Sequence, residues 1–310
     1  MISLFEKTNP ENQNIELGKV SWFRSYEHAL QLSHEKAKPI LLFFQEIPGC
    51  SACVNYGREV LSHPVMVEII ENEFIPLAIY NNKLGPDEEV LWLYNEPAWN
   101  NPVAHFIDES GKDIIEKLEN NYQPLSMLIK IIDTLDKSKG SVPNYINAFK
   151  NELLIKYGHT EMAIYETPCF WSGETTFAQN EAVYSTLPGF IGPREVVKIQ
   201  FDPKKTSKVQ LDEFAIEQGF FSIGNYESFR VDKDPEYYLK KTNYKFLPLT
   251  FTQRMMINYS LPYKKDPTIW LSPKQKKWLA HPDLATKGHP KAYSLKFEQS
   301  WEYMVENFDN

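Results

Sequence analysis

A short apolar run followed by two closely spaced cysteines constrains the fold more than any other feature of this chain. Residues 40–44 are bounded by Pro39 and Pro48, and Cys50 and Cys53 follow directly. A continuous apolar run of this length predicts a buried strand, and residues 51–61 can form a helix. Both cysteines then lie where a strand ends and a helix begins. Backbone N–H groups and the helix dipole there favour a reactive thiolate.

The third cysteine, Cys169, has a similar setting. It follows the apolar run 162–165 and precedes Phe170 and Trp171, so a strand over 161–166 leads to a helix over 170–180. A solitary cysteine is more often a small buried hydrophobe than a nucleophile. Its place between strand and helix, beside two aromatic side chains, favours the nucleophile. The pattern predicts a two-site redox protein.

Composition narrows the class of protein. The chain has 310 residues, 42% hydrophobic and 24% charged, which are the values of a globular protein. A net charge of −8 argues against binding nucleic acid or an anionic membrane. No run approaches the ~20 apolar residues of a membrane span, and residues 1–16 lack the apolar core of a secretory signal. We therefore expect a cytoplasmic protein with no metal and no cofactor; a secreted chain that has lost its signal is the alternative.

The order of predicted elements indicates an α/β protein of two domains. Residues 1–18 are expected to be a flexible arm, and 19–139 to be the first domain, with elements in the order helix, strand, helix, strand, strand, helix. Residues 140–158 are a linker and bridging helix. The second domain, 159–310, begins with an α+β core of order βαββα and ends in an aromatic-rich extension, 225–310, whose periodicity assigns no fold. Trp92 and Trp99 are expected in the core or in groove walls of the first domain.

The first domain resembles the thioredoxin-like superfamily. The pattern consists of Lys38-Pro39, the strand, the motif Gly49-Cys50-Ser51-Ala52-Cys53, and Asn101-Pro102 ahead of another strand. The resemblance implies a cis Pro102 packed beside Cys50, and disulfide exchange with a protein partner. In this reading Cys50 is the exposed attacking thiol and Cys53 is the resolving thiol.

Two other readings of the cysteine pair stay open. A C-x-x-C can hold zinc, but a structural site needs further ligands, and His63 or His105 would have to provide them. The pair can also be a structural disulfide in a domain used for packing or partner binding.

Residues 161–218 resemble the A-type peptide methionine sulfoxide reductases. The matching segments are Pro168-Cys169-Phe170-Trp171 with Glu174 downstream, then 183–186, 188–192 and 195–203. The resemblance implies that Cys169 attacks the sulfoxide sulfur while Phe170 and Trp171 hold the substrate methyl group. Glu195 would protonate the departing oxygen, and Cys169 would leave as a sulfenic acid.

Tyrosine hydroxyls are part of that family's site, and here their positions differ. Phe190 stands where the family has a tyrosine in its Gly-rich turn, and Tyr165, Tyr184 and Tyr226 are the candidate replacements.

Together these features predict thiol-dependent reduction of free or peptidyl methionine sulfoxide by Cys169. The Cys50–Cys53 dithiol would act as a built-in electron donor, and an upstream thiol reductant would regenerate it. Tethering raises the effective concentration of donor and acceptor into the ~mM range. One alternative is a thiol–disulfide oxidoreductase whose degenerate second domain recognises a partner. The other is a non-enzymatic, redox-responsive binding protein.

Overall fold

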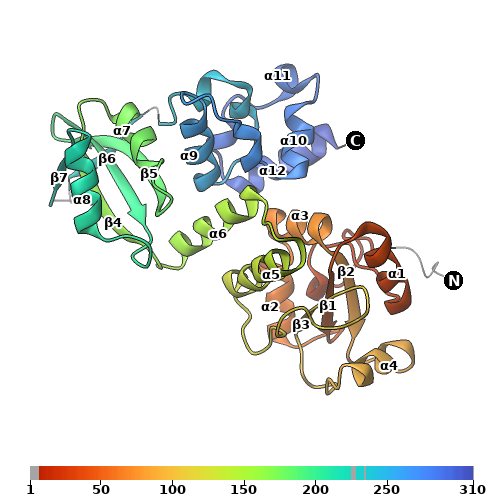
Figure 1. Cartoon of the computed structure of the whole chain (residues 1–310). Coiled ribbons are helices and arrows are strands. Elements are labelled where there is room, and N and C mark those ends of the chain that lie inside the picture. The colour runs from red at the N-terminus through yellow and green to blue at the C-terminus, as the bar shows by residue number, and fades with distance from the viewer. Residues whose placement is uncertain (1–6, 225–227, 234, 310) are drawn as a thin grey trace. The chain divides into compact units, whose positions relative to one another are not determined.

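The computed structural model describes residues 7–224, 228–233 and 235–309, and it divides into two compact units, Met1–Ile146 and Asn147–Asn310 (Figure 1). Helix α6, Asn144–Lys156, spans the division. No helix among the described residues has both the length and the apolar character that a bilayer span requires.

The first unit is built on a three-stranded sheet of order β2-β1-β3. Its central strand β1, Ile40–Gln45, pairs in parallel with β2, Ile75–Tyr80, and antiparallel with β3, Val103–Ile107. Single bridges extend both edges, from Phe23 to Leu77 and from Leu118 to Ala104. All of β1 is buried, which explains why residues 40–44 are continuously apolar rather than alternating.

Helices cover both faces of this sheet. Helices α1, Tyr26–Lys36, and α4, Pro86–Leu93, pack on the face that carries Ile40, Leu42 and Phe44. On the opposite face the ring of Phe43 stacks on Tyr56 of α2, Ser51–Glu59. Helices α3, Pro64–Glu73, and α5, Pro124–Lys139, are joined by a 3.0 Å ion pair between Lys139 and Glu73 (Figure 1).

The predicted flexible arm, residues 1–18, needs correction at its C-terminal end. Residues Ile15–Leu17 form a 3₁₀ helix in which Glu16 and Leu17 are buried. The backbone passes so close to α2 that a Cβ added at Gly57 would lie 1.9 Å from the carbonyl oxygen of Ile15. This contact is long-range, so a local reading of a polar, Asn-rich segment does not find it.

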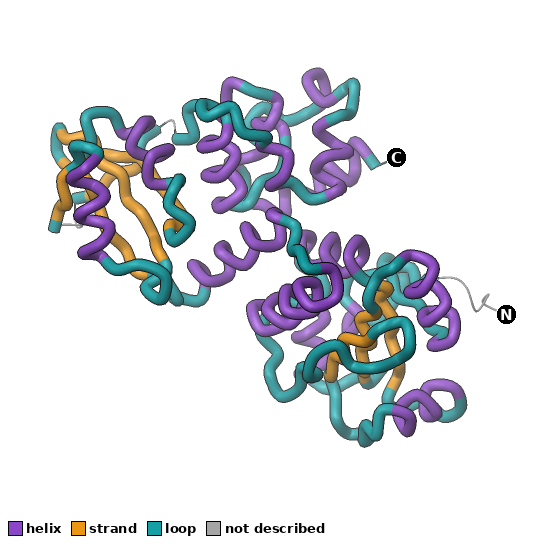
Figure 2. The backbone as a smooth tube through the Cα atoms, viewed as in Figure 1, coloured by secondary structure: helices purple, strands orange, loops and turns teal. Residues whose placement is uncertain are grey.

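The second unit begins with a split βαβ plait in a five-stranded antiparallel sheet of order β7-β4-β6-β5-β8 (Figure 2). The ring of Phe177, on helix α7, packs on Tyr165 of the sheet and on Phe214 of helix α8. The two helices therefore share one face. The elements in chain order are β4 Glu161–Glu166, α7 Phe170–Phe177, β5 Val183–Ile191, β6 Arg194–Phe201, α8 Lys208–Glu217, β7 Phe221–Ile223 and β8 Phe229–Val231.

The extension that the sequence left unassigned forms a helical subdomain with its own core, which includes Trp278 and Trp301. Gln253 and Gln275 each close a capping box, and their side-chain amides also bond to each other at 2.8 and 3.0 Å. These buried amide contacts join the two helices that begin at the capping boxes. The helices are α9 Phe251–Ser260, α10 Pro273–Leu279, α11 Leu284–Lys287 and α12 Phe297–Phe308.

Candidate functional site

The two cysteines of the C-x-x-C motif lie together at the start of α2. Cys50 is the N-cap residue and is exposed, whereas Cys53 is fully buried one turn further along. Both are free thiols, and their sulfur atoms are 3.6 Å apart. The pair is close enough to form a disulfide after a small side-chain adjustment, since it is already brought together by one helical turn.

The surroundings of the two thiols push their acidities apart. Hydrogen bonding from the backbone N–H of Cys53 lowers the pKa of Cys50 and outweighs the opposing effect of burial. Burial raises the pKa of Cys53 to about 12, and the neighbouring Cys50 adds to this effect. Cys50 is therefore deprotonated more readily than Cys53, and its sulfur is more accessible. Attack on an external disulfide requires both properties.

This difference predicts selective alkylation. Iodoacetamide should modify Cys50 with a rate that reaches half its maximum below about pH 8.5, the pKa of an ordinary thiol, while Cys53 stays unmodified. The measurement is the rate against pH, with the modified residue identified by mass spectrometry. Cys50→Ser serves as the control and should remove the fast phase. A midpoint at or above that of a free thiol would contradict the assignment of Cys50 as the activated thiol.

The segment ahead of β3 also reaches the dithiol. The Asn101–Pro102 peptide bond is cis, as the resemblance implies. The contact with the site is made by Asn101, because the thiol of Cys53 donates a hydrogen bond to its Oδ1 at 2.9 Å. Sequence reasoning singled out Pro102 and missed its neighbour, although the same Asn-Pro signal marked both positions.

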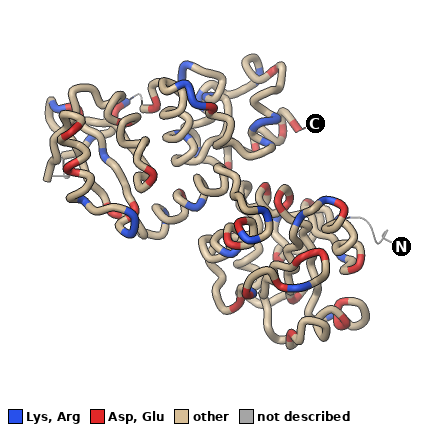
Figure 3. The backbone as a smooth tube through the Cα atoms, viewed as in Figure 1, with Lys and Arg blue, Asp and Glu red and all other residues tan. Residues whose placement is uncertain are grey.

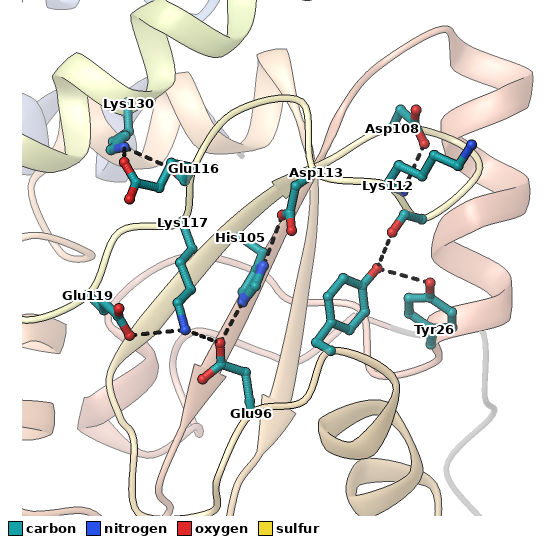
Figure 4. A network of polar contacts seen from close by, with 12 residues as sticks. Tyr26, Glu96, His105, Asp108, Lys112, Asp113, Glu116, Lys117, Glu119 and Lys130 are labelled. Atoms are coloured by element: carbon teal, nitrogen blue, oxygen red, sulfur yellow. Dashed lines mark hydrogen bonds and ion pairs between the residues drawn. The ribbon is translucent and has the colours of Figure 1, made fainter.

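A buried polar network holds the loop that carries Asn101 (Figure 4). Glu96, with its side chain 1% exposed, lies 3.1 Å from Nε2 of His105 and also contacts the Lys117 ammonium. The amide of Asn100 donates to Glu96 at 3.0 Å and to Glu119 at 2.9 Å. The hydrogen bond from Asn100 lowers the pKa of Glu119, and the hydrogen bond from Lys117 lowers it further. Because buried charges are costly unless paired, the network fixes the backbone next to Asn101.

Metal ligation is the alternative use of the same thiols. Among the described residues, one group of three possible ligands contains both cysteines and Glu46, with all donor atoms within 4.8 Å of one another. Neither histidine considered from the sequence joins it. His105 is bound by Glu96 and Asp113, and Nδ1 of His63 accepts the backbone N–H of Val65. The closed four-ligand set of a structural zinc site is therefore not assembled from these residues.

Comparison with known proteins agrees with this geometry. A family described as thioredoxin-like matches residues 21–108. Residues 21–108 form a thioredoxin-like domain.

Two solved structures are similar to part of this chain. One is a DsbH oxidoreductase, 20% identical, with 40% of this chain and 90% of that chain covered and a TM-score of 0.33. The other is a thioredoxin from Thermus thermophilus, 18% identical, with 38% and 88% covered and a TM-score of 0.33. No curated protein matches the chain.

The thioredoxin-like match ends at residue 108 and does not include Cys169 or the rest of the second unit. Cys169 is the N-cap residue of α7 and is partly exposed. Glu195, near the start of β6, accepts a hydrogen bond from the backbone N–H of Phe170 at 2.9 Å. The structure thus brings the predicted thiol and the predicted carboxyl group to the same helix end.

Aromatic side chains surround this helix end. The ring of Phe170 meets Phe190 edge to face at 5.2 Å, and the ring of Trp171 stacks on Tyr237 at 4.0 Å. The ammonium of Lys241 lies 3.3 Å from the centre of the Tyr237 ring. Phe170 and Trp171, predicted to bind substrate, therefore lie on an aromatic surface next to Cys169.

One tyrosine that interacts electrostatically with Cys169 is not among those proposed from the sequence. Burial, and then the negative charge of Cys169, raise the pKa of Tyr238. The hydroxyls of Tyr165 and Tyr184 are engaged elsewhere, since they donate to Asp212 at 2.9 Å and to Asp202 at 2.7 Å. Tyr226, the third candidate, lies outside the described residues. Tyr238 was missed because it belongs to the extension with no assigned fold.

Proposed function

We propose that the thioredoxin-like domain is a thiol–disulfide oxidoreductase acting on polypeptide disulfides. The observation that carries this proposal is the asymmetry of the dithiol: an exposed Cys50 with a lowered pKa lies 3.6 Å from a buried Cys53 with a raised one. The exposure and lowered pKa of Cys50 support the first step of disulfide exchange, and the short distance to Cys53 supports the second.

In the first step the Cys50 thiolate attacks one sulfur of the substrate disulfide. A mixed disulfide forms, and the other substrate sulfur leaves as a thiolate that takes a proton from solvent. Cys53 then loses its proton and attacks Cys50 Sγ, which closes the Cys50–Cys53 disulfide and releases the second substrate thiol. Two electrons pass to the substrate, and an external thiol reductant restores the dithiol.

The test is reduction of insulin and of hydroxyethyl disulfide with dithiothreitol as the reductant. Cys50→Ser should reduce the protein-dependent rate on the order of 10³-fold or more, because the activated nucleophile is lost. Cys169→Ser is the matched control and should keep the wild-type rate. A Cys50→Ser protein that retains full activity would exclude this function for the motif.

We further propose that the second unit reduces methionine sulfoxide. The observation that favours this second function is the position of the Glu195 carboxyl group, which accepts the Phe170 N–H at 2.9 Å, beside Cys169 and its aromatic neighbours. Attack of the Cys169 thiolate on the sulfoxide sulfur would transfer the oxygen to Cys169. The products are methionine and a Cys169 sulfenic acid, with Glu195 as the proton donor to the oxygen.

The dithiol can complete that cycle. Cys50 attacks the sulfenic sulfur and expels water, forming a Cys50–Cys169 disulfide within one chain or between two chains. Cys53 then attacks Cys50, frees Cys169 and leaves the Cys50–Cys53 disulfide. No other cysteine is present in the sequence to resolve Cys169.

Turnover of free and peptidyl methionine sulfoxide with dithiothreitol tests this second function. Wild type should form methionine, and Cys169→Ser should lose this activity on the order of 10³-fold or more. Absence of turnover by wild type on both substrates, combined with active disulfide reduction, would instead favour a partner-recognition role for the second unit. Absence of both activities would favour the redox-responsive binding protein.

A further inference from the structure

Three large apolar side chains of the thioredoxin-like domain are exposed to solvent. Leu84 is 83% exposed, Trp92 69% and Trp99 81%. The sequence predicts both tryptophans in the core or in groove walls of the first domain. The core placement is wrong for both side chains. Tryptophan and leucine expose this much surface at some cost, and a group of them marks an interaction site more often than chance placement.

The loop that precedes α4 and the segment that follows it adjoin the reactive cysteines. Asn82 exchanges two hydrogen bonds with Ile47, three residues before Cys50, at 3.0 and 3.3 Å. The side chain of Asn81 donates to the carbonyl oxygen of Asn100 at 2.9 Å. The loop of Asn81 and Asn82 therefore joins the turn before Cys50 to Asn100. The next residue, Asn101, contacts Cys53.

A hollow of about 230 Å³ lies between these loops and α4. Leu84, Leu91, Trp92 and Ala98 provide its apolar lining. Small-molecule sites usually occupy about 300–1,000 Å³, so this hollow fits a single large side chain better than a free ligand. Trp99, which is 81% exposed, directly follows Ala98 in the chain and lies two residues before Asn101.

The charges around the hollow restrict what can bind there. Glu88 and Lys83 both line it, and Glu46 lies beside Cys50. Asp87, at the start of α4, is already paired with Arg24 at 2.6 Å. Acidic groups on α4 are visible in Figure 3, and Glu88 and Glu46 outnumber Lys83 near the site. An apolar segment with neutral or basic flanks is therefore favoured over an acidic one.

We propose that Leu84, Trp92 and Trp99 form a docking surface for an apolar side chain of a polypeptide substrate, close to the disulfide that Cys50 attacks. The inference rests on the proposed disulfide-reductase function. A substrate disulfide must approach the exposed Cys50, and its chain then passes over the adjoining loops. Rigid aromatic side chains suit this task because they bury a large area with little loss of conformational freedom.

The test compares two substrates that place different demands on this surface. One is a peptide disulfide with leucine or phenylalanine next to the cysteine, made with lysine or glutamate flanks; the other is hydroxyethyl disulfide. Trp92→Ala and Trp99→Ala should each raise KM for the lysine-flanked peptide by about 10-fold or more, as truncation of an interface anchor does. Their rates on hydroxyethyl disulfide should equal that of wild type.

Leu93→Ala is the matched control, because Leu93 is 63% exposed on the same helix but lines a different hollow with Arg24 and Tyr26. It should leave both activities unchanged. Leu84→Ser tests the surface again without removing a tryptophan. The proposal also expects the glutamate-flanked peptide to bind more weakly than the lysine-flanked one.

Equal KM values for wild type and all three surface variants would overturn the docking proposal while leaving the reductase function intact. A dimer that Trp99→Ala dissociates would assign the surface to a second copy of the chain and would also overturn it. Failure of wild type to reduce hydroxyethyl disulfide would instead contradict the underlying function, so the two failures are distinguishable.

Discussion

Replacing Cys53 with serine is expected to trap the thioredoxin-like domain on its substrate as a covalent mixed disulfide. Cys50 keeps its exposed position and its backbone hydrogen bonds, so the first attack proceeds. The serine hydroxyl cannot displace a sulfur, and steady-state turnover should fall on the order of 10³-fold or more. The new hydroxyl can still donate to Asn101 Oδ1, the acceptor that Cys53 uses at 2.9 Å, so the fold should be preserved.

The causes of the raised Cys53 pKa also indicate how this thiol can resolve the mixed disulfide. Burial is the first cause of the raised Cys53 pKa, but the side chain and charge of Cys50 are the next two. Once Cys50 is part of a mixed disulfide it carries no thiolate charge, and those causes disappear. The pKa of Cys53 therefore falls at the stage when its thiolate is needed. With the wild type, release of product should accelerate as pH rises, since more Cys53 is deprotonated.

Mass spectrometry of Cys53→Ser, incubated with a peptide disulfide and without reductant, should show one adduct on Cys50. Cys50→Ser is the control and should show none. Rapid release of the peptide from Cys53→Ser would contradict the assignment of Cys53 as the resolving thiol.

Local sequence signals were sufficient for most of the thioredoxin-like domain. Prolines bound the strand at 40–44, and the C-x-x-C spacing places both sulfurs on the first turn of one helix. The second-unit core has similar signals, since apolar runs such as residues 162–165 mark its strands. These features are set by neighbours within a few residues, so periodicity can detect them.

Contacts between distant segments could not be predicted in the same way. Asn101 reaches Cys53, 48 residues earlier, because β3 pairs with β1 in a particular register. Tyr238, which interacts electrostatically with Cys169, belongs to the extension 225–310, where helix positions depend on long-range contacts such as that between Gln253 and Gln275. The sequence likewise predicts Trp92 in the core or in a groove wall, although its side chain on the short helix α4 is 69% exposed.

Glu195→Gln is expected to lower methionine sulfoxide turnover by about 100-fold or more, the usual range for loss of a general acid. Glutamine retains an oxygen that accepts the Phe170 N–H, now bound at 2.9 Å, so the N-terminus of α7 should stay in place. The substitution therefore removes a transferable proton and keeps the local geometry. Disulfide reduction through Cys50 should be unaffected, which provides an internal control in the same preparation.

Glu174→Gln is the matched control for this second prediction. Glu174 is 2% exposed, and burial, followed by the charge of Glu236, raises its pKa well above the usual range. Burial disfavours a charge at this position, so an uncharged amide of the same shape should change turnover little. If Glu195→Gln kept wild-type turnover while Cys169→Ser abolished it, the proton would have to come from another group. Tyr238 is the next to test, as Tyr238→Phe, because its pKa is raised by burial and then by its interaction with Cys169.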